Sequence, residues 1–256
     1  MPERKKKIFI CATEQSGDNI GYNLINEILK SNNNISFDGV GGSKMLPLMS
    51  NQFYNLKNFN SMGIIEIMFS LKKYIKMIYF LTRKIQENKY DLIITIDSPD
   101  FNYPLVKKIR NNYQNIKIIH IVAPSVWAWR AYRARKFAKV YNELLILYQF
   151  EATYFEKYNL KTTFIGHPIY CINEQQKTDS QKYFAFLPGS RMSEVKVLLP
   201  YFKLAYDNII KSSNDVTIFI PTLPHLKKYV QDYVNKFNLK IVVTTDTVLI
   251  EKFYNN

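Results

Sequence analysis

The sequence is poor in the residues that build disulfide-rich or zinc-binding proteins. Its two cysteines, Cys11 and Cys171, are too few for a disulfide framework and favour a reducing compartment. Its three histidines, His120, His167 and His225, show none of the His/Cys spacing that zinc ligands share. We therefore expect neither a metal site nor a cofactor.

Long apolar runs are also missing. The longest ones are interrupted by Glu66, Ser70 or Lys72, well short of the ~18 residues that span a bilayer. Residues 4–12 place basic residues before an apolar run, as a signal peptide does, but this run stops at Thr13, below the ~7 apolar residues required. We therefore expect a cytoplasmic protein.

The composition is that of a folded globular chain, with 47% hydrophobic and 22% charged residues over 256 positions. Basic residues outnumber acidic ones by 35 to 21, which gives a net charge of +14. Such an excess favours phosphates, anionic lipid or nucleic acid as partners. No nucleic-acid reader motif is present, so we do not expect nucleic acid to be the partner.

Short apolar runs alternate with longer helical patterns through residues 1–170. The expected strands are Ile8–Ala12, Phe37–Val40, Leu92–Ile96, Ile116–Val122, Leu144–Leu147 and Thr163–Ile165, and the expected helices include one with an apolar face at 20, 24, 28 and 29, one at Ser70–Asn88 and one at Leu105–Tyr113. This alternation predicts an α/β, doubly wound parallel sheet, in which ligands bind beyond the carboxyl ends of the strands.

A second unit is expected over residues 183–256, after a polar linker at 171–182. Its expected strands are Tyr183–Leu187, Ile218–Pro221 and Lys240–Thr244, with a helix beginning at Ser193. A Rossmann-type half normally has about six strands, so this unit is predicted to be a partial one.

Two loops that follow strands carry small and acidic residues. In residues 13–18, backbone amides at the start of a helix would face an anion, or else Ser16 or Asp18 would cap that helix. In residues 97–102, two carboxylates would supply a general base, or else the segment is a helix start with Pro99 in its first turn.

Two further loops are aromatic and basic. Residues 123–130 contain both tryptophans of the chain, and basic residues follow at 130, 133, 135, 136 and 139. This pattern suits phosphate, a lipid headgroup or nucleic acid, unless the tryptophans are core residues and the arginines only a solvated face. His167 ends another strand, where a lone histidine is more often structural than catalytic.

The loop at residues 187–191 joins a strand to a helix. Gly189 permits close approach of the backbone and Arg191 offers a bidentate donor, with Glu194 one helical turn on. This geometry suits a diphosphate, although the loop is not a Walker motif.

The helix expected at residues 70–88 has a wide apolar side with a cationic border. Its apolar side carries Leu71, Tyr74, Ile75, Ile78, Leu81 and Ile85, its border carries Lys72, Lys76 and Arg83, and Met77 and Phe80 lie off the main apolar face. The pattern fits an interfacial helix and equally an amphipathic helix of the core.

Seven segments together resemble the lipid-A-disaccharide synthase family. They are residues 14–18, 39–42, 62–66, 97–102, 124–130, 164–168 and 187–191, in the family's order. The resemblance implies a GT-B-like fold with one complete N-terminal and one partial second Rossmann-like domain. It implies transfer of diacylglucosamine from its UDP derivative to diacylglucosamine phosphate (lipid X), with release of UDP. It further implies a peripheral protein at the inner, anionic face of the cytoplasmic membrane.

The same resemblance assigns roles to residues. Asp97 matches the family's base and Arg191 the arginine that stabilises the departing UDP. Substrate-binding positions would be Glu14, Ser16, Gly17, Asp18, Met62, Gly63, Ser125, Trp127, Trp129, Arg130, His167, Gly189 and Ser190.

The family's second domain contains a Ser-Gly-Thr-rich loop that holds UDP and a C-terminal helix, and nothing similar lies between Arg191 and Asn256. We therefore expect the chain alone to transfer little or no sugar and to lack the family's dimerisation through that region. The alternatives are an inactive remnant or split-gene half that only binds membrane lipid, or another GT-B sugar-nucleotide enzyme.

Overall fold

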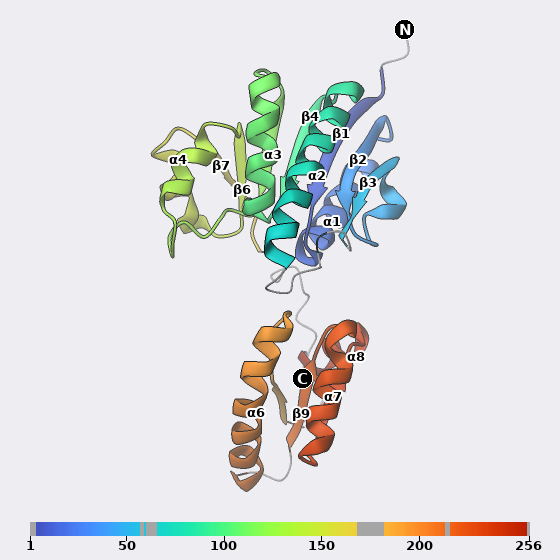
Figure 1. Cartoon of the computed structure of the whole chain (residues 1–256), viewed down its shortest axis with the longest axis vertical. Coiled ribbons are helices and arrows are strands. Elements are labelled where there is room, and N and C mark those ends of the chain that lie inside the picture. The colour runs from blue at the N-terminus through green and yellow to red at the C-terminus, as the bar shows by residue number, and fades with distance from the viewer. Residues whose placement is uncertain (1–3, 57–58, 60–65, 168–181, 213–215, 255–256) are drawn as a thin grey trace. The chain divides into compact units, whose positions relative to one another are not determined.

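The computed structural model describes residues 4–56, 59, 66–167, 182–212 and 216–254. The chain divides into two compact units, Met1–Cys171 and Ile172–Asn256 (Figure 1). Most of the expected linker, and with it Cys171, lies outside the described residues. Within the described residues, no helix combines the length and the apolar character that a membrane crossing requires.

Unit 1 is built from seven strands and the helices between them. Its strands are β1 (Lys6–Ala12), β2 (Ile35–Gly41), β3 (Asn51–Asn55), β4 (Leu92–Ile96), β5 (Lys117–Ile121), β6 (Glu143–Ile146) and β7 (Lys161–Phe164). Its helices are α1 (Gln15–Ser31), α2 (Glu66–Asn88), α3 (Pro99–Asn112), α4 (Tyr132–Ala138) and α5 (Ala152–Glu156), with short 3-10 turns η1 (Leu46–Leu48) and η3 (Gln149–Glu151).

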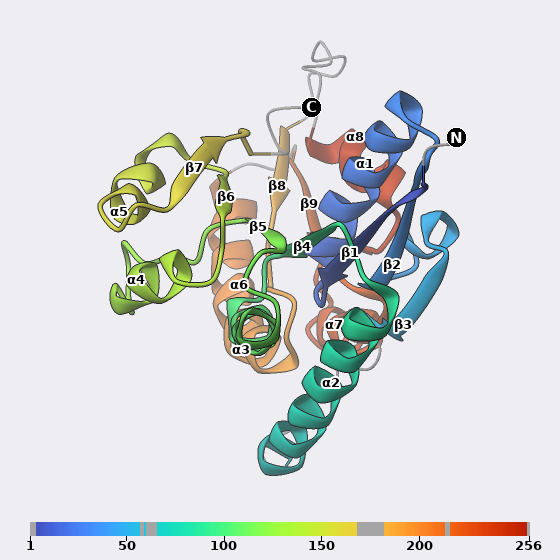
Figure 2. The ribbon, with the colours of Figure 1, turned by 90° about the horizontal axis from the view of Figure 1, so that it is seen from above.

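The seven strands form one parallel sheet in the order β3-β2-β1-β4-β5-β6-β7. Successive side chains of a strand point to opposite faces, so Phe9 packs with α2 and α3 while Ile10 packs with α1. The sheet is covered by α1 on one face and by α2 and α3 on the other (Figure 2). Strands β2 and β3 are added on one side of β1 and strands β4 to β7 on the other, so the strand order changes direction between β1 and β4. The loops after these two neighbouring strands therefore meet at the carboxyl edge of the sheet.

Three features of unit 1 differ from the sequence-based expectations. Strand β3 was not predicted, because its sequence NQFYN is polar and lies at the edge of the sheet. Helix α3 begins at Pro99, as the alternative for residues 97–102 predicted, rather than at Leu105, where the apolar pattern placed its start; the helix also accommodates Pro104. The apolar face of α2 is rotated, so that Met77 is buried at 3% exposure and Ile75 is 46% exposed.

Unit 2 contains the three expected strands and no others among its described residues. They are β8 (Lys182–Ala185), β9 (Val216–Pro221) and β10 (Ile241–Thr244), parallel in the order β10-β9-β8, with helices α6 (Met192–Ser212), α7 (Pro224–Lys236) and α8 (Thr247–Tyr254). Ile218 packs with α6 and α7, whereas Phe219 contacts Phe253 of α8. The α/β fold with a partial second unit is therefore confirmed.

Candidate functional site

Asp97 lies directly after β4, the middle strand of the sheet in unit 1, at its carboxyl end. Asp97 and Ser98 have φ angles of +53° and +45°, a left-handed conformation that is uncommon for residues other than glycine. Asn102 holds this turn, because its Nδ2 donates to the carbonyl oxygens of Ile96 at 3.2 Å and Asp97 at 2.7 Å. The strained turn is thus fixed by a side chain from the first turn of α3.

The loops after β1 and β4 come together around the Asp97 carboxylate, because Ala12 pairs with Ile96 at the strand ends. The Ser16 hydroxyl donates to Asp97 Oδ2 at 3.1 Å, and the Ser98 amide donates to Oδ1 at 2.8 Å. The Ser98 hydroxyl donates to Glu14 Oε1 at 3.0 Å. Asp97 is half-buried and Glu14 is exposed, so the group offers two carboxylates that are held by hydroxyl and amide donors.

Asp18 plays a different part from the one expected of a helix cap. It is fully buried, and its carboxylate accepts bonds from the amides of Gly42 (2.7 Å), Lys44 (3.1 Å) and Met45 (3.2 Å). The residue before α1 is Glu14, and it makes no side-chain capping bond. The capping alternative for Ser16 and Asp18 is therefore wrong, and Asp18 fixes the loop after β2 against α1.

Gly17 explains how the first loop lies so close to the sheet. A Cβ at this position would stand 3.1 Å from Cβ of Ala12 and 3.5 Å from the carbonyl oxygen of Ile96. A larger residue would push the start of α1, and with it Ser16, away from Asp97.

The tryptophan loop follows β5 and is exposed. Trp127 and Trp129 are 50% and 56% exposed, so the alternative that they are core residues is wrong. Ser125 is exposed, and its carbonyl oxygen accepts a hydrogen bond from the backbone amide of Trp129 at 3.2 Å. The Arg130 guanidinium lies over the Trp129 ring at 4.0 Å, and Arg130 Nη1 is 3.4 Å from Asp100 Oδ1.

His167 belongs to a row of aromatic side chains at the carboxyl ends of β5, β6 and β7. Its ring stacks on Tyr148 at 5.6 Å between centroids, Tyr148 stacks on Phe150 at 5.8 Å, and Trp127 meets Phe150 edge-on at 5.7 Å. Met62 and Gly63, which were also predicted to bind substrate, lie outside the described residues. Among the residues that are described, no group of three His, Cys, Asp or Glu side chains could hold a metal ion.

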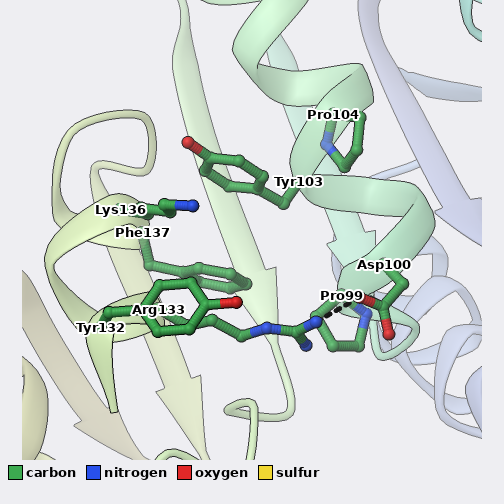
Figure 3. Close-up of a pocket in the computed structure, with 8 residues that line it drawn as sticks. All are labelled: Pro99, Asp100, Tyr103, Pro104, Tyr132, Arg133, Lys136 and Phe137. Carbon is green, nitrogen blue, oxygen red and sulfur yellow. Dashed lines mark hydrogen bonds and ion pairs between the residues drawn. The ribbon is translucent and has the colours of Figure 1, made fainter. Parts of the chain in front are cut away.

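A pocket opens beside the Asp97 turn, between α3 and α4 (Figure 3). Its lining residues are Pro99, Asp100, Tyr103, Pro104, Tyr132, Arg133, Lys136 and Phe137. From the sequence, Arg133 and Lys136 were predicted only as part of a basic run, and no site role was predicted for Tyr103, Tyr132 or Asn102. The one available signal was the spacing of 133 and 136, which places both on one face of a helix.

In unit 2 the loop after β8 is exposed and leads into α6, as predicted. Gly189 has a φ of +88°, which favours glycine. The amides of Ser190 and Arg191 both donate to Glu194 Oε2, at 3.0 and 3.2 Å, and Arg191 Nη1 donates to Glu194 Oε1 at 2.9 Å. The donors expected to bind a diphosphate therefore bind the carboxylate of Glu194.

The hydrogen bond from Arg191 is the main cause that lowers the pKa of Glu194, with the Arg191 and Ser190 amides adding to the effect. Glu194 consequently stays negatively charged and occupies the donors of this loop.

Comparisons with known proteins agree with the fold and identify the family. The curated lipid-A-disaccharide synthase of Rickettsia prowazekii is 39% identical over 227 residues, which cover 84% of this chain and 60% of that protein. The lipid-A-disaccharide synthase of Acinetobacter baylyi is 32% identical over 240 residues, which cover 89% of this chain and 61% of that protein. The chain thus spans about 60% of the length of these relatives.

Solved structures share the two-unit α/β fold. A UDP-GlcNAc 2-epimerase from Neisseria meningitidis, solved with UDP-GlcNAc, has a TM-score of 0.62 at 13% identity and matches 97% of this chain and 74% of its own. S. aureus MnaA, solved with UDP, has a TM-score of 0.65 at 13% identity, with 97% and 71% covered. The sequence profile described as lipid-A-disaccharide synthetase matches residues 8–253. The chain therefore belongs to the lipid-A-disaccharide synthetase family.

Proposed function

We propose that the protein takes part in the synthesis of the lipid A disaccharide, as a transferase that joins two acylated glucosamines. The donor is UDP-diacylglucosamine, the acceptor is diacylglucosamine phosphate, and UDP is released. The observation that best supports this proposal is the position of the Asp97 carboxylate. It lies in a strained turn at the carboxyl end of the central strand and accepts hydrogen bonds from two loops.

In this reaction Asp97 is the general base. The acceptor hydroxyl attacks the anomeric carbon of the donor sugar, its proton passes to Asp97, and the bond to UDP breaks. Ser16 and the Ser98 amide donate to the carboxylate, and these two bonds fix the direction of its free lone pairs. Glu14 accepts a hydrogen bond from the Ser98 hydroxyl and so links the loop after β1 to the loop after β4.

The loop after β8 is the proposed site for the diphosphate of UDP. Arg191 and the amides of Ser190 and Arg191 are directed to a single anionic position, which Glu194 fills. UDP binding would displace Glu194 from these donors, and Arg191 would then stabilise charge on the departing diphosphate.

The test compares two aspartates at opposite ends of β4. Asp97→Asn keeps the shape of the side chain but removes the base, so transfer should fall ~10²- to 10⁴-fold. Asp91→Asn is the matched control, because Asp91 precedes β4 and bonds Arg4 and the Lys7 amide. Disaccharide is followed by thin-layer chromatography in mixed micelles with both acylated substrates.

The assay uses this chain extended by the part of the R. prowazekii relative that the match does not cover, because the proposal concerns the whole enzyme. Asp91→Asn should stay within about twofold of the unsubstituted protein, as surface changes away from a site do. A loss of less than tenfold for Asp97→Asn would refute the assignment of the base.

We further propose that α2 rests on an anionic membrane surface. Ile75 and Tyr79 are exposed on this helix, with Lys72 and Lys76 exposed beside them. Apolar side chains bordered by lysines are typical of interfacial helices.

The double variant Ile75→Ser/Tyr79→Ser should release the protein from vesicles that contain phosphatidylglycerol, as measured by sedimentation. High salt should weaken binding only in part, because apolar insertion is not screened. Leu46→Ser is the control, since Leu46 is an exposed apolar residue on η1 rather than on α2. Equal vesicle binding by the double variant and the unsubstituted protein would exclude α2 as the membrane surface.

A further inference from the structure

The pocket between α3 and α4 is separate from the carboxylate cluster around Asp97, and the proposed transfer step does not use it. Its walls are aromatic and its polar groups are mostly cationic (Figure 3). Arg133 extends across the pocket from α4 and bonds Asp100 on α3. Lys136 lies one helical turn further along α4, on the same side.

The charges of the pocket do not balance. Arg133, Lys136 and Arg130 carry three positive charges at the pocket and its rim, and Asp100 carries the one negative charge among the residues that line it. The Arg133 side chain is only 14% exposed, whereas Asp100 is 73% exposed. A largely buried cation is costly without a counter-charge, and its exposed partner is weakened by solvent. A bound anion would balance the excess.

The donors of the pocket have the chemistry to bind a phosphate group. Asp100 engages Nη2 of Arg133, and a guanidinium carries five donors in a planar fork that matches phosphate oxygens. Lys136 lies 4.6 Å from the Tyr132 ring, and Arg130 lies on Trp129, so both cations are held at the edge of the pocket. Burial raises the pKa of Tyr103, so its hydroxyl stays protonated and can donate.

The pocket is also close to the proposed base. Asp100 follows Asp97 by three residues, which limits the separation of their Cα atoms to roughly 10 Å. One sugar ring between the two sites would therefore present a hydroxyl to Asp97 and a substituent on its far side to Arg133.

We propose that this pocket binds the phosphate monoester of the acceptor sugar through Arg133 and Lys136, with Arg130 at the rim. The inference rests on the proposed function for the identity of the acceptor as a sugar phosphate. The binding itself requires no turnover, so it is measured on the full chain without donor.

The experiment titrates the 256-residue chain with glucosamine 1-phosphate and with unphosphorylated glucosamine, by calorimetry and by tryptophan fluorescence. Trp129 is a suitable reporter because it contacts Arg130 and lies 5.7 Å from Arg133. Binding of the phosphate and not of glucosamine is expected. Arg133→Gln should weaken it about tenfold and Lys136→Gln about threefold, as loss of charge-assisted bonds does.

Arg135→Gln is the matched control, since Arg135 is an exposed residue of α4 that does not line the pocket. It should change affinity less than twofold. Thermal unfolding shows whether Arg133→Gln disturbs the fold. If it does, Lys136→Gln still tests the inference, because Lys136 is exposed. Equal losses for Arg135→Gln and Lys136→Gln, or unchanged affinity in both pocket variants, would overturn the inference.

Two further measurements are needed. The first distinguishes a sugar phosphate from a lipid headgroup as the ligand, and the second distinguishes failure of this inference from failure of the proposed function. If phosphatidylglycerol vesicles bind through Arg133 while the soluble sugar phosphate does not, the pocket is a lipid headgroup site and the inference is wrong. In the extended enzyme, Arg133→Gln should raise KM for diacylglucosamine phosphate about tenfold with little change in kcat. An unchanged KM beside an Asp97-dependent reaction would refute this inference and leave the proposed function standing. If the sugar phosphate binds but the extended enzyme transfers no sugar, the proposed function is refuted and this inference stands.

Discussion

The loops after β4 and β8 each join a strand to the helix that follows it, and the arrangement of their charged groups is opposite. After β4 a carboxylate, Asp97, is surrounded by donors from Ser16 and Ser98. After β8 a set of donors, the amides of Ser190 and Arg191 and the guanidinium, surrounds the carboxylate of Glu194. The loop after β4 therefore presents a candidate base, and the loop after β8 presents an anion site that Glu194 of α6 occupies.

Other strand-end loops of unit 1 also differ from the loop after β8 in how firmly they are held. The loop before α1 is tied to the loop after β2 by Asp18, which is buried and accepts three amide bonds. The loop after β8 is closed by an exposed i,i+3 ion pair, and such pairs contribute little to stability. A strand-end loop is thus fixed where its polar groups are buried and adjustable where they face solvent.

The largest expected effect comes from a matched pair of glycine substitutions. A Cβ at Gly42 would lie 2.4 Å from Oδ2 of the buried Asp18, so Gly42→Ala should lower the free energy of unfolding of unit 1 by about 3 kcal/mol. A Cβ at Gly189 would lie 2.3 Å from Oε2 of Glu194, a side chain that can move into solvent. The new Cβ would also lie 2.9 Å from Cβ of Glu194, so the exposed turn must shift slightly. Gly189→Ala should therefore cost the strain of positive φ and this shift, together about 2 kcal/mol.

Both tryptophans lie in unit 1, so their fluorescence during urea unfolding reports on that unit alone. Hydrogen exchange of peptides from residues 182–254 reports on unit 2. A larger cost for Gly189→Ala than for Gly42→Ala would contradict the difference in rigidity between the loops.

The next effect is the acid sensitivity of unit 1, which arises from His120. Complete burial lowers the pKa of His120 from 6.5 to about 3, and Thr95 Oγ1 lies 2.7 Å from its Nδ1. The unfolded chain therefore binds one more proton than the folded chain between these pH values, and stability falls as pH drops below 6.5. From pH 7 to pH 5 the free energy of unfolding of unit 1 should fall on the order of 2 kcal/mol through this residue.

His120→Gln keeps a polar side chain without titration in this range. Urea unfolding by tryptophan fluorescence should show a smaller loss between pH 7 and pH 5 in the variant than in the unsubstituted chain. Equal losses in the two proteins would exclude His120 as the source.

The smallest expected effect tests whether Glu194 competes for the anion site. Glu194→Gln removes the negative charge from the loop, so inorganic pyrophosphate should bind about threefold more tightly, as expected for an exposed ion pair. Calorimetric titration of the full chain measures this change. The control is Asp207→Asn, which breaks the partly buried pair with Lys203 elsewhere on α6 and should leave pyrophosphate affinity unchanged. Weaker binding by Glu194→Gln would mean that Glu194 organises the loop instead of occupying it.

Much of the fold follows from local pattern. Strand β4 was predicted with its observed bounds, because five apolar or β-branched residues run between Asp91 and Asp97. Strand β3 was missed because an edge strand needs no apolar face, and the start of α3 was misplaced because Pro104 resembles a boundary. The rotation of α2 was not predictable either, since Met77 and Ile75 are equally apolar and only the sheet beneath decides which is buried.

The sequence by itself determined which segments are strands, which loops follow them and, through ordered motifs, the family. Tertiary structure alone decided what the polar residues of those loops do. Asp18 and Asp97 are both acidic residues of strand-end loops, but Asp18 is buried under the loop after β2 and Asp97 is only half-buried. Their partners Gly42 and Ser16 lie 24 and 81 residues away in the chain. Likewise the pocket exists only where α3 and α4 meet. Such contacts depend on strand order and register, which no local pattern of residues encodes.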